Sequence, residues 1–92
     1  MSRRYIVVDN RDNVATAITD IMKGEAVEVD GRRITIVDDI RYGHKFALQT
    51  IPKDEYVVKY GERIGRATAA IHAGSHVHVH NVEDIVDEVR KL

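Results

Sequence analysis

Three histidines alternate with valine near the C-terminal end of the chain, at His76, His78 and His80. Alternation with period 2 predicts a strand with two different faces, the valines packing on a core. Same-face residues of a strand lie about 6.5–7 Å apart, so His78 and His80 can converge on one ion, whereas His76 and His80 would lie about 13 Å apart. A pair of imidazoles about 2.0–2.1 Å from a metal, completed by ligands from elsewhere, is one interpretation. An exposed polar face of a strand is the other, and both stay open.

A second cluster, Gly43-His44-Lys45, combines a proton carrier with a cation. Histidine is a common general acid or base, so His44 suits proton transfer. Lys45 offers a compact charge for a carboxylate, and the glycine before them lets backbone approach a ligand closely. Taken by itself, the cluster is explained more simply as a turn with two exposed polar residues.

The clearest predicted helix begins at Asp12 or Asn13, residues that suit a helix N-cap. Apolar residues then recur at helical spacing, and Gly24 provides a stop after Lys23. These apolar residues are Val14, Ala17, Ile18 and Ile21. As caps, Asp12 and Asn13 would place the free amides of the helix N-terminus beside an anionic ligand.

The remaining pattern is β-like and punctuated by glycine. Asp30-Gly31 predicts a tight type I′ hairpin turn between residues 26–29 and 34–37. Further strands are predicted at 46–48, 56–60 and 64–71, and no internal repeat is apparent. Asn81 suits the N-cap of a short C-terminal helix, because Ile85 and Val89 fall on one side. The predicted fold class is therefore mainly β with one or two short helices.

Composition excludes several classes of function. The 92 residues make one domain, and 14 Lys plus Arg against 15 Asp plus Glu give a net charge of -1. This balance provides no basic footprint for nucleic acid and no polybasic patch for a membrane surface. There is no cysteine for a disulfide or a thiolate site. No apolar run approaches the ~20 residues of a membrane span, so we expect a cytoplasmic domain. Its small size favours a homo-oligomer or a larger partner.

Taken together and in order, the clusters resemble the small SAF domain of the altronate and galactarate dehydratases and the alpha subunit of sulfolactate sulfo-lyase. The resemblance runs over residues 5–81 and rests on the ordered set rather than on one motif. The matching segments are Asp12-Asn13-Val14-Ala15, Gly43-His44-Lys45-Phe46-Ala47-Leu48, Lys59-Tyr60-Gly61, Ile64-Gly65 with Ala67, and Gly74 with His76-Val77-His78-Val79-His80-Asn81.

This resemblance implies a single SAF-type β-clip domain over residues 1–92. It also implies the small subunit of a lyase that eliminates water, or sulfite, from a hydroxylated acid. The dehydratases depend on iron or manganese, and much of their machinery lies in a large domain, so a large dehydratase subunit is the expected partner. We expect His44 and Lys45 to be catalytic and His78 and His80 to bind the Fe²⁺ or Mn²⁺. The residues expected to contact the sugar acid are Asp12, Asn13, Lys59, Tyr60 and Asn81.

One departure from the family pattern concerns Asp9. Family members commonly carry a histidine three residues before the Asp-Asn pair, where this chain has Asp9. A carboxylate substituting for that histidine, a shifted specificity and a loss of activity are all open. The main alternative function is a non-catalytic module that binds the acid or braces a large subunit. A sulfolactate sulfo-lyase subunit and a small metal-binding protein are further alternatives.

Overall fold

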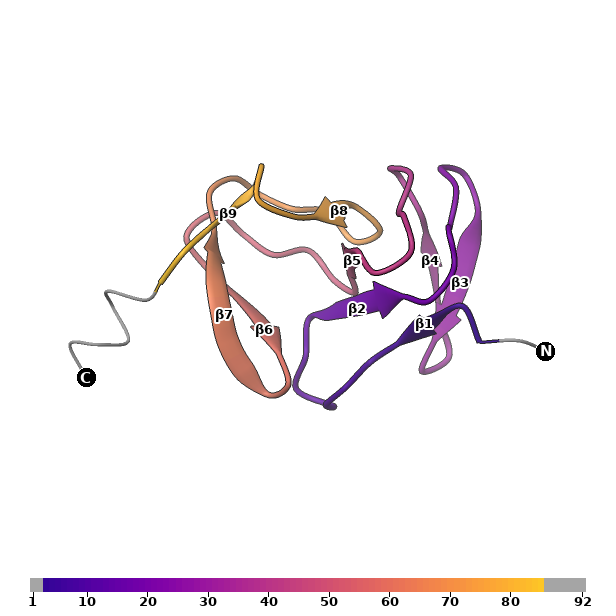
Figure 1. Ribbon diagram of the computed structural model, residues 1–92, viewed down its shortest axis with the longest axis horizontal. Coiled ribbons are helices and arrows are strands. Elements are labelled where there is room, and N and C mark those ends of the chain that lie inside the picture. Colours follow the sequence, from indigo (N-terminus) through magenta and orange to yellow (C-terminus); the bar gives the residue numbers. More distant parts are fainter. Residues whose placement is uncertain (1–2, 86–92) are drawn as a thin grey trace.

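The protein is built from short antiparallel strands, and the computed structural model describes residues 3–85 (Figure 1). Mainly β architecture is therefore confirmed. Within the described range no residue is helical, and no helix is long and apolar enough to span a membrane. The strands are β1 (Tyr5–Ile6), β2 (Val14–Ala17), β3 (Ala26–Val29), β4 (Arg32–Thr35), β5 (Lys45–Ala47), β6 (Tyr56–Lys59), β7 (Glu62–Ala67), β8 (His76–Val77) and β9 (Val82–Glu83).

A four-stranded sheet with the order β1-β2-β5-β8 occupies the centre of the molecule. The β3–β4 hairpin lies at one end of this sheet, and the three-stranded sheet β6-β7-β9 lies at the other (Figure 1). Segments far apart in the sequence thus become neighbours. Phe46 of β5 pairs with Ala15 of β2 on one side and with His76 of β8 on the other.

A seven-residue unit occurs four times between Ile21 and Val77. Each unit starts with isoleucine, has Gly or Asp at its fourth position and an apolar residue at its seventh. The four units are 21–27, 40–46, 51–57 and 71–77. Their fourth residues all have positive φ: Gly24 (94°), Gly43 (84°), Asp54 (74°) and Gly74 (86°). This left-handed turn is the feature that explains why glycine dominates the position.

The units pair two by two, which gives the molecule two equivalent halves. Ile21 bridges Ile40 and Ile51 bridges Ile71, each pair exchanging two backbone hydrogen bonds of 2.7–2.8 Å. The first unit of the second half lies 30 residues after that of the first, so the expectation of no internal repeat was wrong. The repeat is carried by backbone conformation, and most side chains between the shared positions differ.

Each half carries one two-residue hairpin turn. The predicted turn at Asp30-Gly31 is confirmed, with φ of 50° and 78° linking β3 to β4. Its counterpart, Tyr60-Gly61, links β6 to β7 with φ of 61° and 70°. Positive φ at both positions is the type I′ geometry, whose twist matches that of the flanking strands.

The helix predicted from Asp12 or Asn13 to Lys23 was wrong, because Val14–Ala17 forms strand β2. This strand lies between β1 and β5 and is buried on both faces, with Val14, Ala15 and Ala17 each 1% exposed. A strand buried on both faces shows no apolar–polar alternation, so the spacing of its apolar residues imitated a helix. The helix predicted after Asn81 was also wrong at its start, where Val82–Glu83 is β9. The rest of it, from Val86 to Val89, lies outside the described residues.

Two apolar clusters form the core, one for each half. The first, under β3 and β4, is centred on Phe46, Ile21 and Ile36. The second, between the central sheet and β6–β7, contains Val57 and Val77. The central sheet contributes side chains to both clusters: Phe46 of β5 lies in the first, whereas Ala47 of β5 and Val77 of β8 lie in the second.

Candidate functional site

A cluster of histidine rings lies where β5 and β8 meet. His44 directly precedes β5, and its Nδ1 lies 2.8 Å from His76 Nε2 on β8. The His78 ring stacks on the His44 ring with centroids 4.6 Å apart. One ring nitrogen from each of His44, His76 and His78 can be chosen so that all three lie within 4.8 Å of one another. The structure therefore brings the two sequence clusters together.

A turn after Val77 positions His78. Strand β8 ends at Val77, so the strand predicted through His80 was wrong beyond that residue. Asn81 closes the turn: its Oδ1 accepts from the His78 amide at 3.0 Å, and its Nδ2 donates to the His76 carbonyl at 2.8 Å. The His80 ring folds back against His76, with centroids 5.2 Å apart. The spacing of an extended strand, which separated His76 from His80, does not apply to a turn.

The three converging imidazoles fit a transition metal. Two nitrogens bound to one ion at about 2.0–2.1 Å lie roughly 2.9–3.4 Å apart, and the His44–His76 separation of 2.8 Å is close to that range. Burial lowers the pKa of His76 and of His78, and the charge on neighbouring histidines lowers both pKa values further. Neutral imidazole is the form that binds metals. Three nitrogen ligands leave coordination positions for water or substrate.

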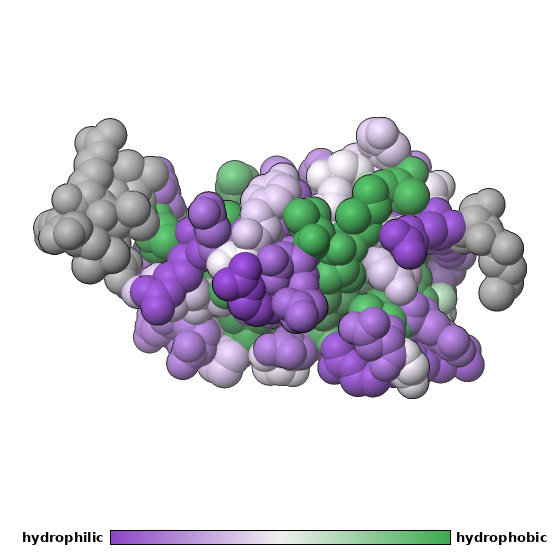
Figure 2. All heavy atoms as spheres, turned by 90° about the horizontal axis from the view of Figure 1, so that it is seen from below, coloured by the Kyte–Doolittle hydropathy of each residue, from purple (hydrophilic) through white to green (hydrophobic). Residues whose placement is uncertain are grey.

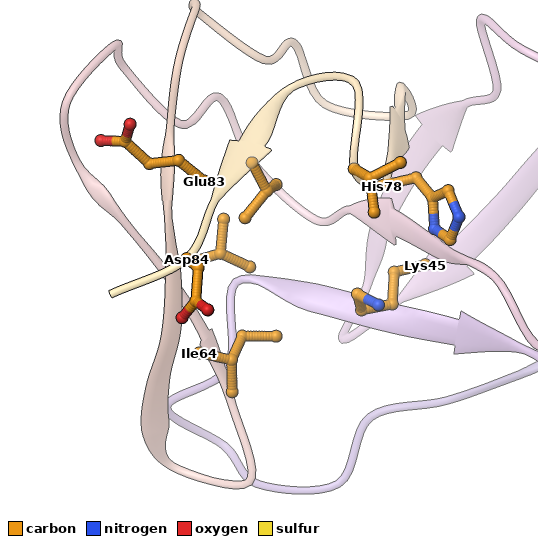
Figure 3. Close-up of a pocket in the computed structure, with 8 residues that line it drawn as sticks. Lys45, Ile64, His78, Glu83 and Asp84 are labelled. Atoms are coloured by element: carbon orange, nitrogen blue, oxygen red, sulfur yellow. The ribbon is translucent and has the colours of Figure 1, made fainter. Parts of the chain in front are cut away.

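A cleft of about 350 Å³ opens beside the histidines. Figure 3 shows Lys45 and His78 next to each other on one wall, with Ile64 and Asp84 on the opposite wall. The Glu83 side chain points away from the space between them (Figure 3). The lining residues are Lys45, Val57, Ile64, His78, Val79, Val82, Glu83 and Asp84. The cleft thus joins a cation and an imidazole across an apolar floor, as small-molecule sites commonly do.

Residues 3–85 match the altronate/galactarate dehydratase SAF domain. The chain belongs to this family. It is 41% identical to an altronate dehydratase of Bacillus subtilis over 88 residues, and 49% identical to an altronate dehydratase of Escherichia coli over 78 residues. These alignments cover 96% and 85% of this chain but only 18% and 16% of the two relatives. The resemblance to this family is confirmed.

A third relative has nearly the same length as this SAF domain. The chain is 34% identical over 90 residues to the (2R)-sulfolactate sulfo-lyase subunit alpha of Chromohalobacter salexigens, which covers 90% of this chain and 96% of the relative. The relatives therefore present the domain in two arrangements. In one it is a small part of a long dehydratase, and in the other it is a separate subunit.

Asp12 and Asn13 of the SAF domain connect its N-terminal turn to the β6–β7 hairpin. The buried Asp12 carboxylate accepts backbone N–H groups of Asp9 at 3.0 Å, Tyr60 at 3.1 Å and Gly61 at 2.8 Å. Asn13 accepts from the Val58 amide at 2.8 Å and donates to the Tyr56 carbonyl at 2.9 Å. No helix begins here, so the capping interpretation was wrong. Contact with substrate remains a prediction for both residues.

Lys59 and Tyr60 lie at the end of the same hairpin. The Lys59 Nζ lies 4.8 Å from the centroid of the Tyr60 ring, which is 56% exposed. The positive charge of Lys59 also reaches Lys45: burial lowers the Lys45 pKa most, and Lys59 lowers it further. Substrate contact by Lys59 and Tyr60, like that by Asn81, stays a prediction. Asn81 has the structural task of holding the histidine turn.

Asp9 occupies the position at which the family resemblance predicts a histidine, and it is bound by Arg11. The Arg11 amide and Nε each donate to Asp9 Oδ1 at 2.9 Å, and the guanidinium lowers the pKa of Asp9 to about 2. A Cβ atom at Gly61 would collide with this ion pair, so the pair rests directly on the Tyr60-Gly61 turn. A carboxylate held in this way is a poor proton acceptor at neutral pH.

Two residues near the site were missed from the sequence. His76 was set aside because an extended strand separates it from His80. The other is Thr16, whose buried hydroxyl has no hydrogen-bond partner within residues 3–85 and which is in register with Lys45 across β2 and β5. The repeat makes β2, β5 and β8 equivalent segments, but their pairing in one sheet, which brings both residues to the site, is seen only in the structure.

Proposed function

We propose that this chain is the SAF subunit of a sugar-acid dehydratase of the altronate type, acting with a separate large subunit in the cytoplasm. The observation that supports this function most is the cleft, which is lined by Lys45 and by His78 of the histidine cluster. Family membership supports the lyase class, and the separate alpha subunit among the relatives supports a two-chain enzyme. A SAF-type β-clip and the choice of acid belong to the same proposal.

In this proposal His76 and His78 hold a divalent Fe²⁺ or Mn²⁺, and His80 stacks behind His76. Bound there, the ion supplies Lewis-acid stabilisation of charge on a substrate oxygen, a contribution of several kcal/mol. The converging nitrogens and the lowered pKa values of both histidines support this assignment. His80 was part of the pair expected from the sequence, and its ring position suits a supporting role better than direct ligation.

His44 is assigned to proton transfer, which typically contributes ~10²–10⁴-fold to a rate. Its Nδ1 lies 2.8 Å from His76 Nε2, and its ring stacks on that of His78, which lines the cleft. A third-ligand role for His44 is the alternative, and the two roles differ in a measurable way. Loss of a ligand weakens metal binding, whereas loss of a proton carrier lowers the turnover number and leaves metal affinity unchanged.

Reconstitution tests this function. The purified chain is mixed with the large dehydratase subunit and Fe²⁺ or Mn²⁺, and altronate, galactarate and sulfolactate are assayed for 2-keto acid or sulfite. We expect turnover only with both chains present. The double variant His76→Ala, His78→Ala should lose at least 100-fold, while His72→Ala, the exposed histidine outside the cluster, should not change it. Full turnover by the double variant would contradict the assignment.

A non-catalytic bracing module is the second candidate function. The saturated hydrogen bonds of Asp12 and Asn13 favour it, because these residues stabilise the fold without a free group for a ligand. A stable two-chain complex whose turnover ignores the histidine variants would support bracing.

A further inference from the structure

We propose that Lys45, Lys59 and the Thr16 hydroxyl form an anion subsite that binds the carboxylate or sulfonate end of an open-chain hydroxy acid. The subsite belongs to this chain alone and needs neither a metal nor the large subunit for binding. Only the choice of hydroxy acids as ligands rests on the function proposed above. The residues come from three strands: Thr16 from β2, Lys45 from β5 and Lys59 from β6.

Neither lysine has a carboxylate partner among the described residues. The ion pairs in residues 3–85 join Arg4 to Glu25, Arg11 to Asp9 and Arg66 to Glu83, so these acids are already engaged. Lys45 is nevertheless half-buried in the wall of the cleft. A partly buried ammonium without a counter-ion is unfavourable, and a bound anion removes that cost.

The two lysines also repel each other, which strengthens the argument for a ligand of opposite charge. Lys59 does not line the cleft, but its positive charge lowers the pKa of Lys45 and so acts on that ammonium group. An anion between two ammonium groups is attracted by both and screens their repulsion. Tyr60, beside Lys59, places a hydroxyl-bearing ring at the same end of the hairpin.

The Thr16 hydroxyl is the independent observation. Its Oγ1 is fully buried and has no hydrogen-bond partner among the described residues, although most buried polar atoms have one. Thr16 pairs directly with Lys45, and directly paired residues of an antiparallel ladder project from the same face of the sheet. Thr16 lies next to Lys45 in the sheet and does not line the cleft itself, so an anion has to move inward from the cleft to become the acceptor that this hydroxyl lacks.

The cleft also indicates which anion fits. At about 350 Å³ it suits a short acyclic acid, and its floor carries the apolar side chains of Val57 and Val82. His78 borders the same cleft as Lys45 (Figure 3). A ligand whose anionic end meets Lys45 therefore presents its next carbons and hydroxyls to His78. This is the arrangement of a 2-hydroxy acid.

Binding to the isolated full chain, with EDTA present, tests the subsite. Galactarate, sulfolactate and galactitol are titrated at low salt, and affinities are measured by NMR shift changes. We expect both acids to bind and the uncharged galactitol to bind at least tenfold more weakly. Raising the salt concentration should weaken the binding of the two acids but not that of galactitol. Equal binding of galactarate and galactitol would overturn the proposal, and the ratio of galactarate to sulfolactate separates carboxylate from sulfonate.

Three variants locate the site, and an exposed lysine serves as control. Both Lys45→Met and Lys59→Met keep the apolar stem of the side chain. We expect Lys45→Met to weaken galactarate binding at least tenfold and Lys59→Met to weaken it about threefold. Lys53→Met, on an exposed turn, should change nothing. Thr16→Val should weaken the anion while leaving the free chain as stable as before, because it removes an unpaired buried hydroxyl. Wild-type affinity in Lys45→Met would contradict the subsite.

The dehydratase function and the anion subsite can be contradicted independently of each other. A chain that binds galactarate through Lys45 but supports no turnover retains the subsite and loses the dehydratase function. If the reconstituted enzyme turns over but the isolated SAF chain does not bind anions, the proposed function is supported and the subsite is contradicted.

Discussion

The two halves of this SAF domain have the same backbone plan and different chemistry. Each half has a type I′ hairpin, a pair of bridged isoleucines and a cleft beside the hairpin. The cleft of the first half, about 280 Å³, is lined by Arg3, Tyr5, Val7, Asp9, Asn10, Val29 and Asp30, without histidine or lysine. That of the second half contains both Lys45 and His78.

The chemical difference between the two halves arises at one strand of the repeated backbone. His44 and Lys45 occupy the positions that Val14 and Ala15 occupy 30 residues earlier on β2. The β2 residues are almost fully buried, at 1% exposure each, whereas His44 and Lys45 are half-buried at the edge of a cleft. A repeated backbone can thus keep its hydrogen bonds while one copy exchanges apolar contacts for titratable groups. Figure 2 shows another face of the molecule, where an apolar band lies between hydrophilic regions.

Equivalent glycines of the two halves should differ most in their response to alanine. Gly43 and Gly74 occupy the same position of the unit, with φ of 84° and 86°. A Cβ atom at Gly74 would overlap the Thr35 carbonyl oxygen, whereas at Gly43 nothing lies within 4 Å. We expect Gly74→Ala to reduce the free energy of unfolding by more than ~4 kcal/mol and Gly43→Ala by about 1–2 kcal/mol. Urea denaturation measures both, and equal losses would show that the overlap is relieved by small backbone shifts.

Equivalent apolar residues at the end of the unit should differ next. Phe46 and Val77 are both 0% exposed, one in each core cluster. Phe46→Ala should cost about 3–5 kcal/mol of unfolding free energy through a large cavity. Val77→Ala should cost about 1.5–3 kcal/mol, because the buried area lost is smaller. A larger loss at Val77 would mean that the second half, not the first, dominates the stability of the fold.

Local turn chemistry was predictable from the sequence, and long-range pairing was not. Asp30-Gly31 determines its own hairpin, because two residues with positive φ between strands leave little choice. Strand β2 was mistaken for a helix, since a strand buried on both faces carries no period-2 signal and its environment depends on β1 and β5. The sheet, not the segment, decides its conformation.

The candidate site followed the same rule. The residue types of His44, Lys45 and His78 suggested chemistry, and family resemblance placed them in one function. Their convergence depends on the pairing of β5 with β8 and on the turn that Asn81 closes after Val77. An extended strand separates His76 from His80, but the turn stacks their rings. Spacing along the chain could not anticipate that turn.

A buried and an exposed aspartate, each of which accepts backbone N–H groups, should also differ in how much they contribute to the free energy of unfolding. The Asp12 carboxylate accepts three amides around the second hairpin, whereas Asp20 accepts the exposed Tyr42 amide at 2.8 Å in the first half. Asp12→Ala should lower the unfolding free energy by about 2–4 kcal/mol, because it leaves N–H groups unpaired in a buried place. Asp20→Ala should cost about 0.5–1.5 kcal/mol, since water replaces its single bond. Similar losses in thermal denaturation would mean that water also reaches the Asp12 amides.

The smallest expected effect is the pH dependence of the Asp9–Arg11 pair beside the second hairpin. Arg11 lowers the folded-state pKa of Asp9 to about 2, below the usual unfolded value of about 3.9. The ionised carboxylate is therefore favoured by folding, and its contribution to stability is present above pH ~4 and lost as the pH falls towards 2. The stability difference between wild type and Asp9→Asn should shrink over that range in urea titrations at fixed pH.

The Arg4–Glu25 pair of the first half is the matched control. Arg4 lowers the pKa of Glu25 from its ordinary value of 4.5, so Glu25→Gln should show the same sign, beginning at a slightly higher pH. Both pairs are solvent-exposed, so 1 M salt should remove most of either effect by screening. A difference for Asp9→Asn that persists unchanged to pH 2 would show that Asp9 stabilises the turn through shape rather than charge. Asp9 would then be a structural residue of the turn with no electrostatic role.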